Sequence, residues 1–395
     1  MLKVISTEEH PIKMWLNDIE DGALEQAKNL ANLPFIHKHV AIMPDSHQGY
    51  GMPIGGVIAT SGVVIPNAVG VDIGCGMCAV KTNLTEIDTN KLKEIMSEIR
   101  KQIPVGFNHH KDPQDENLMP HIAPYVIDGV VEKEYNNARM SLGTLGGGNH
   151  FIEIQKGSDG YIWIMIHSGS RNLGKKVADY YNNVAKMMNT LWYSSVPKEH
   201  QLAFLPLCTE VGERYLKEMQ YCVAFALANR KLMMRRIEQI FFDKTNCAIV
   251  NDGITLPDGM INIAHNYAIM EHHFNKDVMV HRKGATLARK GTIGIIPGSQ
   301  GTSSYIVKGL GNSESFKSCS HGAGRKMSRT KARNELDLKK EIKKLDDKNI
   351  IHSIRHTNDL DEASGAYKDI DIVMENQKDL VEILVKLEPL AVIKG

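Results

Sequence analysis

An aspartate and a cysteine three residues apart, Asp72 and Cys75, lie in the glycine-rich stretch 70–77, GVDIGCGM. Its three glycines in eight residues oppose a regular helix or strand, so we expect a tight bend that turns both side chains toward one point. An oxygen ligand and a sulfur ligand that converge suit a metal ion. Taken alone, the stretch fits equally well with a glycine-rich turn that carries a half-buried cysteine.

Two histidines extend the metal-site hypothesis. Strand-like runs at 151–154 and 161–167 flank the turn residues 156–160, KGSDG, and together they predict a β-hairpin. If Gln155 pairs with Ile162, His150 falls opposite His167, where Cβ atoms lie roughly 4.5–5.5 Å apart. Such a pair could bind one metal ion or two adjacent ones, whereas a shift of one residue would put the histidines on opposite faces.

A histidine in sterically open surroundings is the third chemical feature. His321 lies in the segment 320–324, SHGAG, where small neighbours suit a reacting group better than a packed one. The densest basic segment follows at 326–333, KMSRTKAR; it fits a solvated helix face, but its position favours contact with phosphate. Two loops of small residues, SGSRNLG at 168–174 and PGSQG at 297–301, offer free amides for the same purpose.

Helices and strands must position these residues. Apolar periodicity predicts helices at 15–33, 89–102, 175–192, 209–241, 335–346 and 377–386, and strands at 39–47, 57–65, 261–267 and 277–296. Asp88 or Thr89 is the expected N-cap of the second helix. His272 and His273 are expected on a helix surface, and residues 105–140 show no clear pattern. Since no linker or repeat interrupts the chain, we expect one domain that covers residues 1–395.

Composition excludes several classes of protein. A hydrophobic fraction of 42% in 395 residues is ample for a large core. The 47 basic and 46 acidic residues leave a net charge of +1, so a polyanion must bind a local patch. We find no signal peptide and no apolar run of membrane-spanning length. Six cysteines without an export signal predict a cytoplasmic protein, and the single C-x-x-C opposes a four-cysteine zinc site.

Eight segments, in order along nearly the whole chain, resemble those of the RtcB-type RNA ligases. They are PDSHQGYG, GVDIGCGM, LGGGNHF, HSGSRNLG, AHNY, PGSQG, SHGAGRKMSR and a terminal IKG. The resemblance implies an α+β fold with a central β-sheet core flanked by helices. It also implies an enzyme of RNA repair or tRNA splicing that depends on GTP and two Mn²⁺ ions. Such enzymes join RNA 3′-phosphate or 2′,3′-cyclic phosphate ends to 5′-hydroxyl ends.

The resemblance further implies roles for single residues. His321 is expected to be the nucleophile that carries GMP, Asp45 to orient it, and Arg171 to contact the RNA phosphate. The expected manganese ligands are Asp72, Cys75, His150, His167 and His265, with Cys75 between the two ions. The expected GMP contacts are Asn149, His150, His265, Asn266, Pro297, Gly298, Ser299, Gln300, Ser304, His321, Gly322, Ala323, Gly324, Arg325 and Lys394. The ligand types alone would favour zinc, so manganese rests on the resemblance.

Two other functions fit parts of the sequence. A metal phosphoesterase would use the same ligands and release phosphate without forming a covalent nucleotide. A non-enzymatic RNA-binding factor fits poorly, because the net charge is near zero and a set of reactive side chains would have no use. Residues 105–140 and the 310s are short compared with the commonest family form, which suits a specialised RNA-repair branch. An archease-type activator is a candidate partner, and the sequence defines neither the natural RNA nor the oligomeric state.

Overall fold

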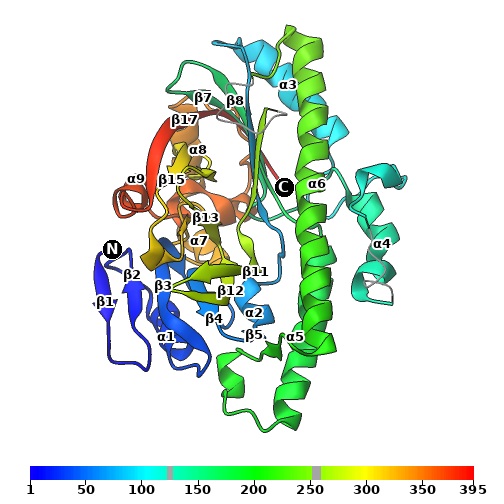
Figure 1. Ribbon diagram of the computed structural model, residues 1–395. Helices are drawn as coiled ribbons and strands as arrows, with labels where there is room; N and C mark the ends of the chain where they lie inside the picture. The colour runs from blue at the N-terminus through cyan, green and yellow to red at the C-terminus, as the bar shows by residue number, and fades with distance from the viewer. Residues whose placement is uncertain (122–127, 251–258) are drawn as a thin grey trace.

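The computed structural model describes residues 1–121, 128–250 and 259–395, and it has the expected α+β architecture. Two mainly antiparallel sheets lie beside one long helix, α6 (Glu210–Thr245), which runs almost the full height of the molecule (Figure 1). Residues 122–127, within the segment that the sequence left unclassified, lie outside the described part of the chain.

The first sheet has six strands in the order β1-β2-β3-β4-β12-β11. Their bounds are β1 Lys3–Ile5, β2 Ile12–Met14, β3 Ile36–His47, β4 Ile54–Thr60, β12 Lys276–Lys283 and β11 Asn266–His273. Strand β3 carries Asp45 near its end, and β11 begins directly after His265. The sheet therefore carries the predicted orienting carboxylate on β3 and begins its strand β11 directly after one predicted metal ligand.

The second sheet has seven strands in the order β10-β6-β8-β7-β17-β15-β14. Their bounds are β10 Met260–Ala264, β6 Gly76–Lys81, β8 Ile162–Ser168, β7 Phe151–Gly157, β17 Val381–Lys394, β15 Ser304–Gly309 and β14 Ile293–Ile296. Two short pairs complete the strands, β5 (Val63–Val64) with β9 (Leu205–Pro206) and β13 (Ala285–Leu287) with β16 (Ser318–Ser320). Strand β16 leads straight into His321.

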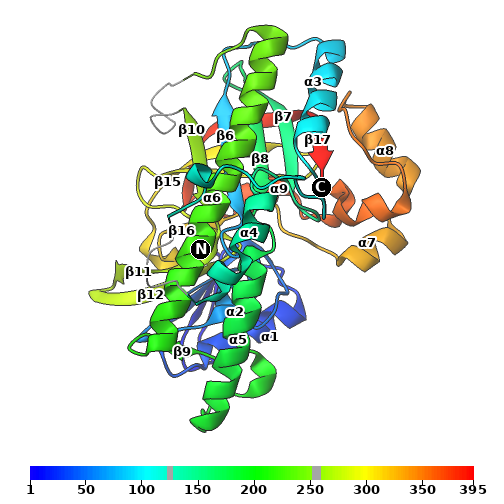
Figure 2. The same ribbon diagram turned by 90° about the vertical axis from the view of Figure 1, so that its right-hand side faces the viewer.

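Helices cover the sheets and extend beyond them. Their bounds are α1 Asp21–Ala31, α2 Pro66–Val69, α3 Thr89–Gln102, α4 Val130–Ser141, α5 Leu173–Leu191, α7 Arg329–Glu335, α8 Leu338–Asp346 and α9 Ile370–Glu375. Helix α3 has the predicted bounds, and the Asp88 side chain caps it by accepting from Asn90 N and Lys91 N. Figure 2 shows α3 and α8 on the same side of the molecule, with the chain's C-terminal residues between them.

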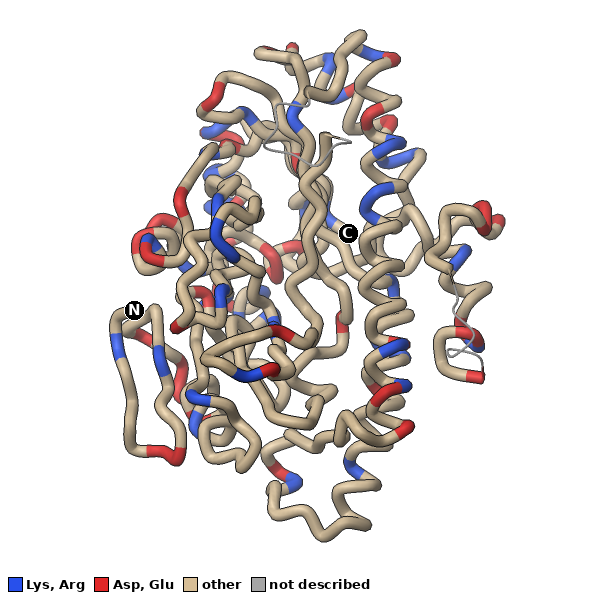
Figure 3. Tube along the Cα trace, viewed as in Figure 1, with Lys and Arg blue, Asp and Glu red and all other residues tan. Residues whose placement is uncertain are grey.

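Apolar packing fixes α6 against both its helix and its strand neighbours. One buried cluster joins α3 and α6 to the second sheet and includes Ile95, Ile164 and Ile237. Another joins α4, α5 and α6, and a third joins the first sheet to β14 and β15. Basic and acidic positions are interspersed along the trace (Figure 3). Among the described residues, no helix has the length and apolar character needed to cross a membrane.

Two helix predictions from the sequence are wrong. Residues 377–386 were expected to be helical, yet the segment enters the long strand β17, which pairs with β15 and β7. Residues His272 and His273 lie on strand β11, not on a helix. In both places pairing with strands from distant parts of the chain outweighs local helical periodicity.

The predicted hairpin exists, but its register is wrong by one residue. Gln155 pairs with Trp163, and Phe151, not His150, is opposite His167. His150 lies just before β7 begins, so the alternation of strand faces does not apply to it. The two imidazole rings still meet, with centroids 5.3 Å apart, because the loop before β7 turns the His150 side chain back toward His167.

Candidate active site

The stretch around Asp72 and Cys75 bends as the glycines predict. Gly70 and Gly74 have φ angles of 95° and 78°, in the left-handed region that glycine enters at little cost. Gly74 also packs closely on α6, since a Cβ placed there would lie 2.9 Å from Val223 Cα. Any other residue at position 74 would therefore disturb both the bend and its contact with α6.

Five side chains form two triads that share the Cys75 sulfur. Within each triad, Asp72–Cys75–His150 and Cys75–His167–His265, the candidate ligand atoms all lie within 4.8 Å of one another. Cys75 Sγ is 3.5 Å from His150 Nε2 and 3.3 Å from His167 Nε2, and His150 Nε2 is 3.1 Å from Asp72 Oδ2. The five predicted metal ligands are thus brought together, and the shared sulfur suits two neighbouring ions.

The protonation states of this cluster fit divalent cations. Burial lowers the pKa of His167 and His265 well below the ordinary value, so both rings are neutral and offer lone pairs. His167 donates Nδ1–H to the Asn149 carbonyl, which leaves Nε2 as its ligand atom. Burial and the Asp72 carboxylate raise the pKa of the Cys75 thiol, so a cation would stabilise its thiolate.

Two buried nitrogens of the cluster lack a partner in the described part of the chain, although His150 turns its other nitrogen, Nε2, toward Asp72 and Cys75. His150 Nδ1 and His265 Nδ1 have no hydrogen-bond partner within the described residues. Buried polar atoms are rarely left without a partner, and a nearby ligand is one way to satisfy them. The donor set of one sulfur, one carboxylate and three imidazoles therefore fits metal ions.

His321 lies beside the cluster and is held by a fully buried carboxylate. Its Nδ1 donates to Asp45 Oδ2 at 2.6 Å, and the same oxygen accepts from the backbone N–H of His321 at 3.1 Å and of Gly322 at 3.3 Å. The predicted partnership with Asp45 is therefore present as geometry. Because Nδ1 carries the proton, Nε2 holds a free lone pair.

The imidazoles form a continuous row from the metal ligands to His321. Successive ring centroids are 5.3 Å apart for His150 and His167, 5.2 Å for His167 and His265, and 4.8 Å for His265 and His321. A phosphate in contact with ions held by the triads would accordingly lie near His321.

Two loops of small residues, 297–300 and 321–325, lie at His321. Both contain predicted nucleotide contacts. Gly324 has a φ of 73°, and a Cβ there would lie 2.1 Å from the Asp45 carbonyl oxygen, so only glycine fits. A Cβ on Gly322 would lie 3.3 Å from the Pro297 carbonyl oxygen, which places the 321–325 loop against the 297–300 loop. Ala323 is buried next to these glycines.

The 297–300 loop is linked to the second sheet by hydrogen bonds. Gly298 N donates to Ser304 Oγ at 3.1 Å, and Gln155 Nε2 donates to the same oxygen at 3.1 Å. Ser299 N donates to Thr302 Oγ1 at 2.7 Å. The Oε1 atoms of Gln155 and Gln300 are buried and have no partner within the described residues. Two hydrogen-bond acceptors near the 297–300 loop are therefore unused.

Two predicted nucleotide contacts are occupied by the protein itself. Asn266 donates to the Asp72 carbonyl at 3.0 Å and accepts from Gly284 N at 2.7 Å. Arg325 donates to Met327 O, to Asp361 O and to the Glu362 carboxylate, at 3.1, 2.6 and 3.1 Å. These two side chains therefore hold loops in place.

Glu153 and Glu362 lie beside the predicted nucleotide contacts and were missed by the sequence reasoning. Glu362 joins Arg325, Arg329 and Tyr367, and its carbonyl accepts from Gln300. Glu153 is buried on β7, accepts from Gln155, and shares a sheet face with Lys394 across the β7–β17 ladder. Burial raises the pKa of Glu153 to about 8 and lowers that of Lys394. A charged residue within the apolar strand 151–154 was the available signal for Glu153.

Arg171 lies at the start of α5 with a φ of 51°. Its Nε donates to Thr144 Oγ1 at 2.7 Å and its Nη2 to the Gly106 carbonyl at 2.9 Å. Nη1 has no hydrogen-bond partner within the described residues. The guanidinium is therefore fixed on one side and free to bind an anion on the other.

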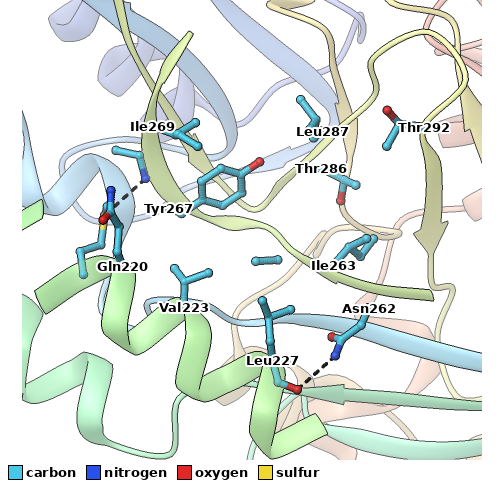
Figure 4. Close-up of a pocket in the computed structure, with 13 residues that line it drawn as sticks. Gln220, Val223, Leu227, Asn262, Ile263, Tyr267, Ile269, Thr286, Leu287 and Thr292 are labelled. Carbon is cyan, nitrogen blue, oxygen red and sulfur yellow. Dashed lines mark hydrogen bonds between the residues drawn. The ribbon is translucent and has the colours of Figure 1, made fainter. Parts of the chain in front are cut away.

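A separate cavity of about 290 Å³ lies between α6 and the β10–β11 region (Figure 4). Its walls are mainly apolar and include Val223, Leu227, Ile263 and Tyr267. With few polar groups it does not suit a nucleotide. The chemistry therefore belongs to the histidine row and its loops.

This arrangement of two ligand triads beside an oriented histidine defines a metal-dependent enzyme. Residues 26–395 match the family model described as tRNA-splicing ligase RtcB. The chain is 40% identical to the RNA-splicing ligase RtcB of Escherichia coli K12, over 100% of this chain and 99% of that protein. It is 33% identical to a tRNA-splicing ligase RtcB of Nanoarchaeum equitans, over 98% and 95% of the two chains. The chain belongs to the RtcB family of RNA ligases.

Proposed function

We propose that this enzyme joins an RNA 3′-phosphate or 2′,3′-cyclic phosphate end to a 5′-hydroxyl end, with GTP as the nucleotide substrate and Mn²⁺ as the metal. The observation that carries this proposal is the position of His321, between the buried Asp45 carboxylate and the metal-ligand cluster. A phosphoesterase would have no need for an imidazole that a buried carboxylate orients beside the metal-ligand candidates.

The metal ions would be held by the two triads that share Cys75. When bound, they would withdraw charge from phosphate oxygens and so make the phosphorus more reactive. The choice of Mn²⁺ over Zn²⁺ follows the family and not the ligand types, which alone would favour Zn²⁺.

His321 would act as the nucleophile. Its Nε2 lone pair attacks the α-phosphorus of GTP, an N–P bond forms, and the bond to the departing pyrophosphate breaks. Positive charge then develops on the ring, and the Asp45 carboxylate, 2.6 Å from Nδ1, stabilises it. Asp45 is thus a positioning residue that acts through His321.

The RNA ends would then react in turn. An oxygen of the 3′-phosphate attacks the same phosphorus, the N–P bond breaks, and His321 regains its lone pair. The 5′-hydroxyl attacks the activated 3′-phosphate, loses its proton to solvent, and GMP departs. A cyclic phosphate must first be opened by water. Arg171 would hold the RNA phosphate during these steps, using guanidinium donors that its bonds to Thr144 and Gly106 leave over.

Glu153 and Lys394 would select the base. Guanine presents N1–H and an exocyclic NH₂ as adjacent donors and O6 as an acceptor. Hydrogen bonds from these donors would stabilise the ionised form of Glu153, so the side chain would give up its proton when guanine binds and accept from both donors, while an ammonium donates to O6. Adenine lacks this pattern, so a buried Glu153 next to Lys394 favours GTP over ATP.

The test is formation of a covalent nucleotide. With Mn²⁺ and α-labelled GTP, the wild-type enzyme should form an acid-labile protein–GMP adduct, and RNA with a 3′-phosphate should discharge it. His321→Ala should form none. His272→Ala is the matched control, because that histidine is exposed on β11 and pairs with Asp277. Release of phosphate from RNA without any adduct would support the phosphoesterase instead.

A further inference from the structure

A second cavity, of about 300 Å³, lies between α3 and residues 351–355, away from the histidine row. Its floor is apolar and includes Met96, Ile351 and Val392. Its polar lining consists of Lys93, Ser97, Arg100, His352, Ser353 and Arg355, and none of the lining residues carries a carboxylate. The volume is about ten times that of one liquid water molecule, which is enough for a phosphate group.

The cationic side chains of this cavity come from one face of α3. Lys93, Ser97 and Arg100 are spaced i, i+4 and i+7, so they project from α3 in one direction. The other basic residues of the helix are paired, Lys91 with Glu94 and Lys101 with Glu98. Within the described residues, neither Lys93 nor Arg100 forms an ion pair.

Arg355 brings a third positive charge to the same cavity. Its Nη1 donates to the Ile354 carbonyl at 2.6 Å and its Nη2 to the His352 carbonyl at 3.3 Å, so the guanidinium is held in place by its own segment. The remaining N–H donors of the Arg355 guanidinium are free for a ligand. Burial, and then the charge of Arg355, lower the pKa of Arg100, which shows that the two cations repel each other.

Two carboxylates are bonded to this lining, and neither forms an ion pair with its cations within the described residues. Within this lining, Asp359 accepts only from the backbone N–H of Arg355, at 2.8 Å. Asp346, on α8, is 3.2 Å from His352 Nε2, while His352 Nδ1 accepts from Ile354 N at 3.3 Å. Both ring nitrogens of His352 are therefore used, and the negative charge of Asp346 faces His352. A bound anion would compensate Lys93, Arg100 and Arg355.

The cavity adjoins the proposed nucleotide site through strand β17. Val392 lines the cavity, and Lys394 lies two residues further on the same face of the strand, about 7 Å along it. We propose that Lys93, Arg100 and Arg355 bind a backbone phosphate of the RNA substrate, beyond the ends that react. This inference rests on the proposed function only in taking RNA as the substrate.

The test measures RNA binding separately from chemistry. The probe is a fluorescent RNA of roughly 12 nucleotides with hydroxyl ends, which cannot react, and the readout is anisotropy over a range of salt concentrations. Arg100→Gln and Lys93→Gln should each raise Kd about tenfold. Each should also lower the slope of log Kd against log salt by about 0.7, as loss of one single-strand phosphate contact requires.

Lys101→Gln is the matched control, because it removes the same charge from the same helix but from a residue paired with Glu98. Thermal unfolding confirms that each variant folds. Kd values and salt slopes equal to those of Lys101→Gln would overturn the proposal. So would a loss of protein–GMP adduct in Arg100→Gln with unchanged RNA binding, since the cavity would then serve the nucleotide. Absence of the adduct in the wild type would instead refute the proposed function and leave the RNA-binding result standing.

Discussion

The bond between Asp45 and His321 allows a quantitative prediction. Asp45→Asn keeps the size of the side chain and an oxygen that can accept from the backbone N–H groups of His321 and Gly322, but it removes the negative charge. The ring would keep its place, whereas the positive charge that develops on it during attack on GTP would lose its partner. We therefore expect a slower chemical step with nearly unchanged binding of GTP.

The size of the effect follows from the geometry. The carboxylate is fully buried and its oxygen lies 2.6 Å from Nδ1, so the bond is charge-assisted and little screened by solvent. Hydrogen bonds to charged groups contribute about 1.5–3 kcal/mol. Since about 1.36 kcal/mol of barrier is a factor of ten in rate, Asp45→Asn should form the GMP adduct about 10- to 150-fold more slowly.

The assay is single-turnover formation of the labelled adduct at a series of GTP concentrations. The maximal rate should fall in Asp45→Asn, and the half-saturating GTP concentration should stay within about threefold of the wild-type value. Asp371→Asn is the control, because Asp371 also accepts a hydrogen bond, from Tyr305 at 2.6 Å, but does not touch His321. A folded Asp45→Asn enzyme with the wild-type maximal rate would refute the reasoning.

Three further outcomes are expected. Cys75→Ser removes the atom shared by both triads and should weaken Mn²⁺ binding by at least about 10- to 100-fold in calorimetric titration; unchanged affinity would rule out a shared ligand. Burial opposes ionisation of Glu271, but His273 and Arg282 lower its pKa to about 2, so its stabilisation is present above pH 4.5 and is lost as pH falls toward 2. Glu271→Gln should therefore lower the free energy of unfolding in urea at pH 7 by about 3–5 kcal/mol, because Arg282 keeps a buried unpaired charge. The variant should also lose less stability than the wild type as pH falls from 4.5 toward 2. A dependence of stability on pH equal to that of the wild type would contradict this. Burial raises the pKa of Glu153 to about 8, so wild-type stability should fall as pH rises from 4.5 to 8. Glu153→Gln should abolish that fall and reduce the preference for GTP over ATP in the adduct assay, and a variant that keeps both properties would exclude the assigned role.

Local signals in the sequence were enough for several elements. Helix α3 was predictable residue by residue, since both its apolar face and its Asp88 cap lie within the helix and its flank. The bend at 70–77 was predictable because glycine spacing restricts the backbone directly. That bend made Asp72 and Cys75 candidate metal ligands, and both lie in the cluster. The hairpin argument named His150 and His167 as further candidates, although the register it used was wrong by one residue.

Other features depend on contacts that no local pattern records. The hairpin register was misjudged because His150 belongs to a loop and not to the ladder, and the rings meet through the loop's own path. Strand β17 was misjudged because it is stabilised by β7 and β15, which lie far away in sequence. Glu362 had no local signal at all, since its importance comes from Arg325 and Arg329 converging on it.

The place of β17 also dictates when the enzyme can form during its synthesis. β7 and β15 both pair with β17 and not with each other, and β7 precedes it by more than 200 residues. Until residues 381–394 have emerged, the hydrogen-bonded ladder of the second sheet is in two pieces, β10-β6-β8-β7 and β15-β14, although β14 also contacts β6 and β10 in the folded protein. One piece carries the β7–β8 histidine, and the other carries the loop after β14. Closing such a long separation is slow, so a nascent chain that already contains every candidate metal ligand would still lack the complete sheet beside the candidate site.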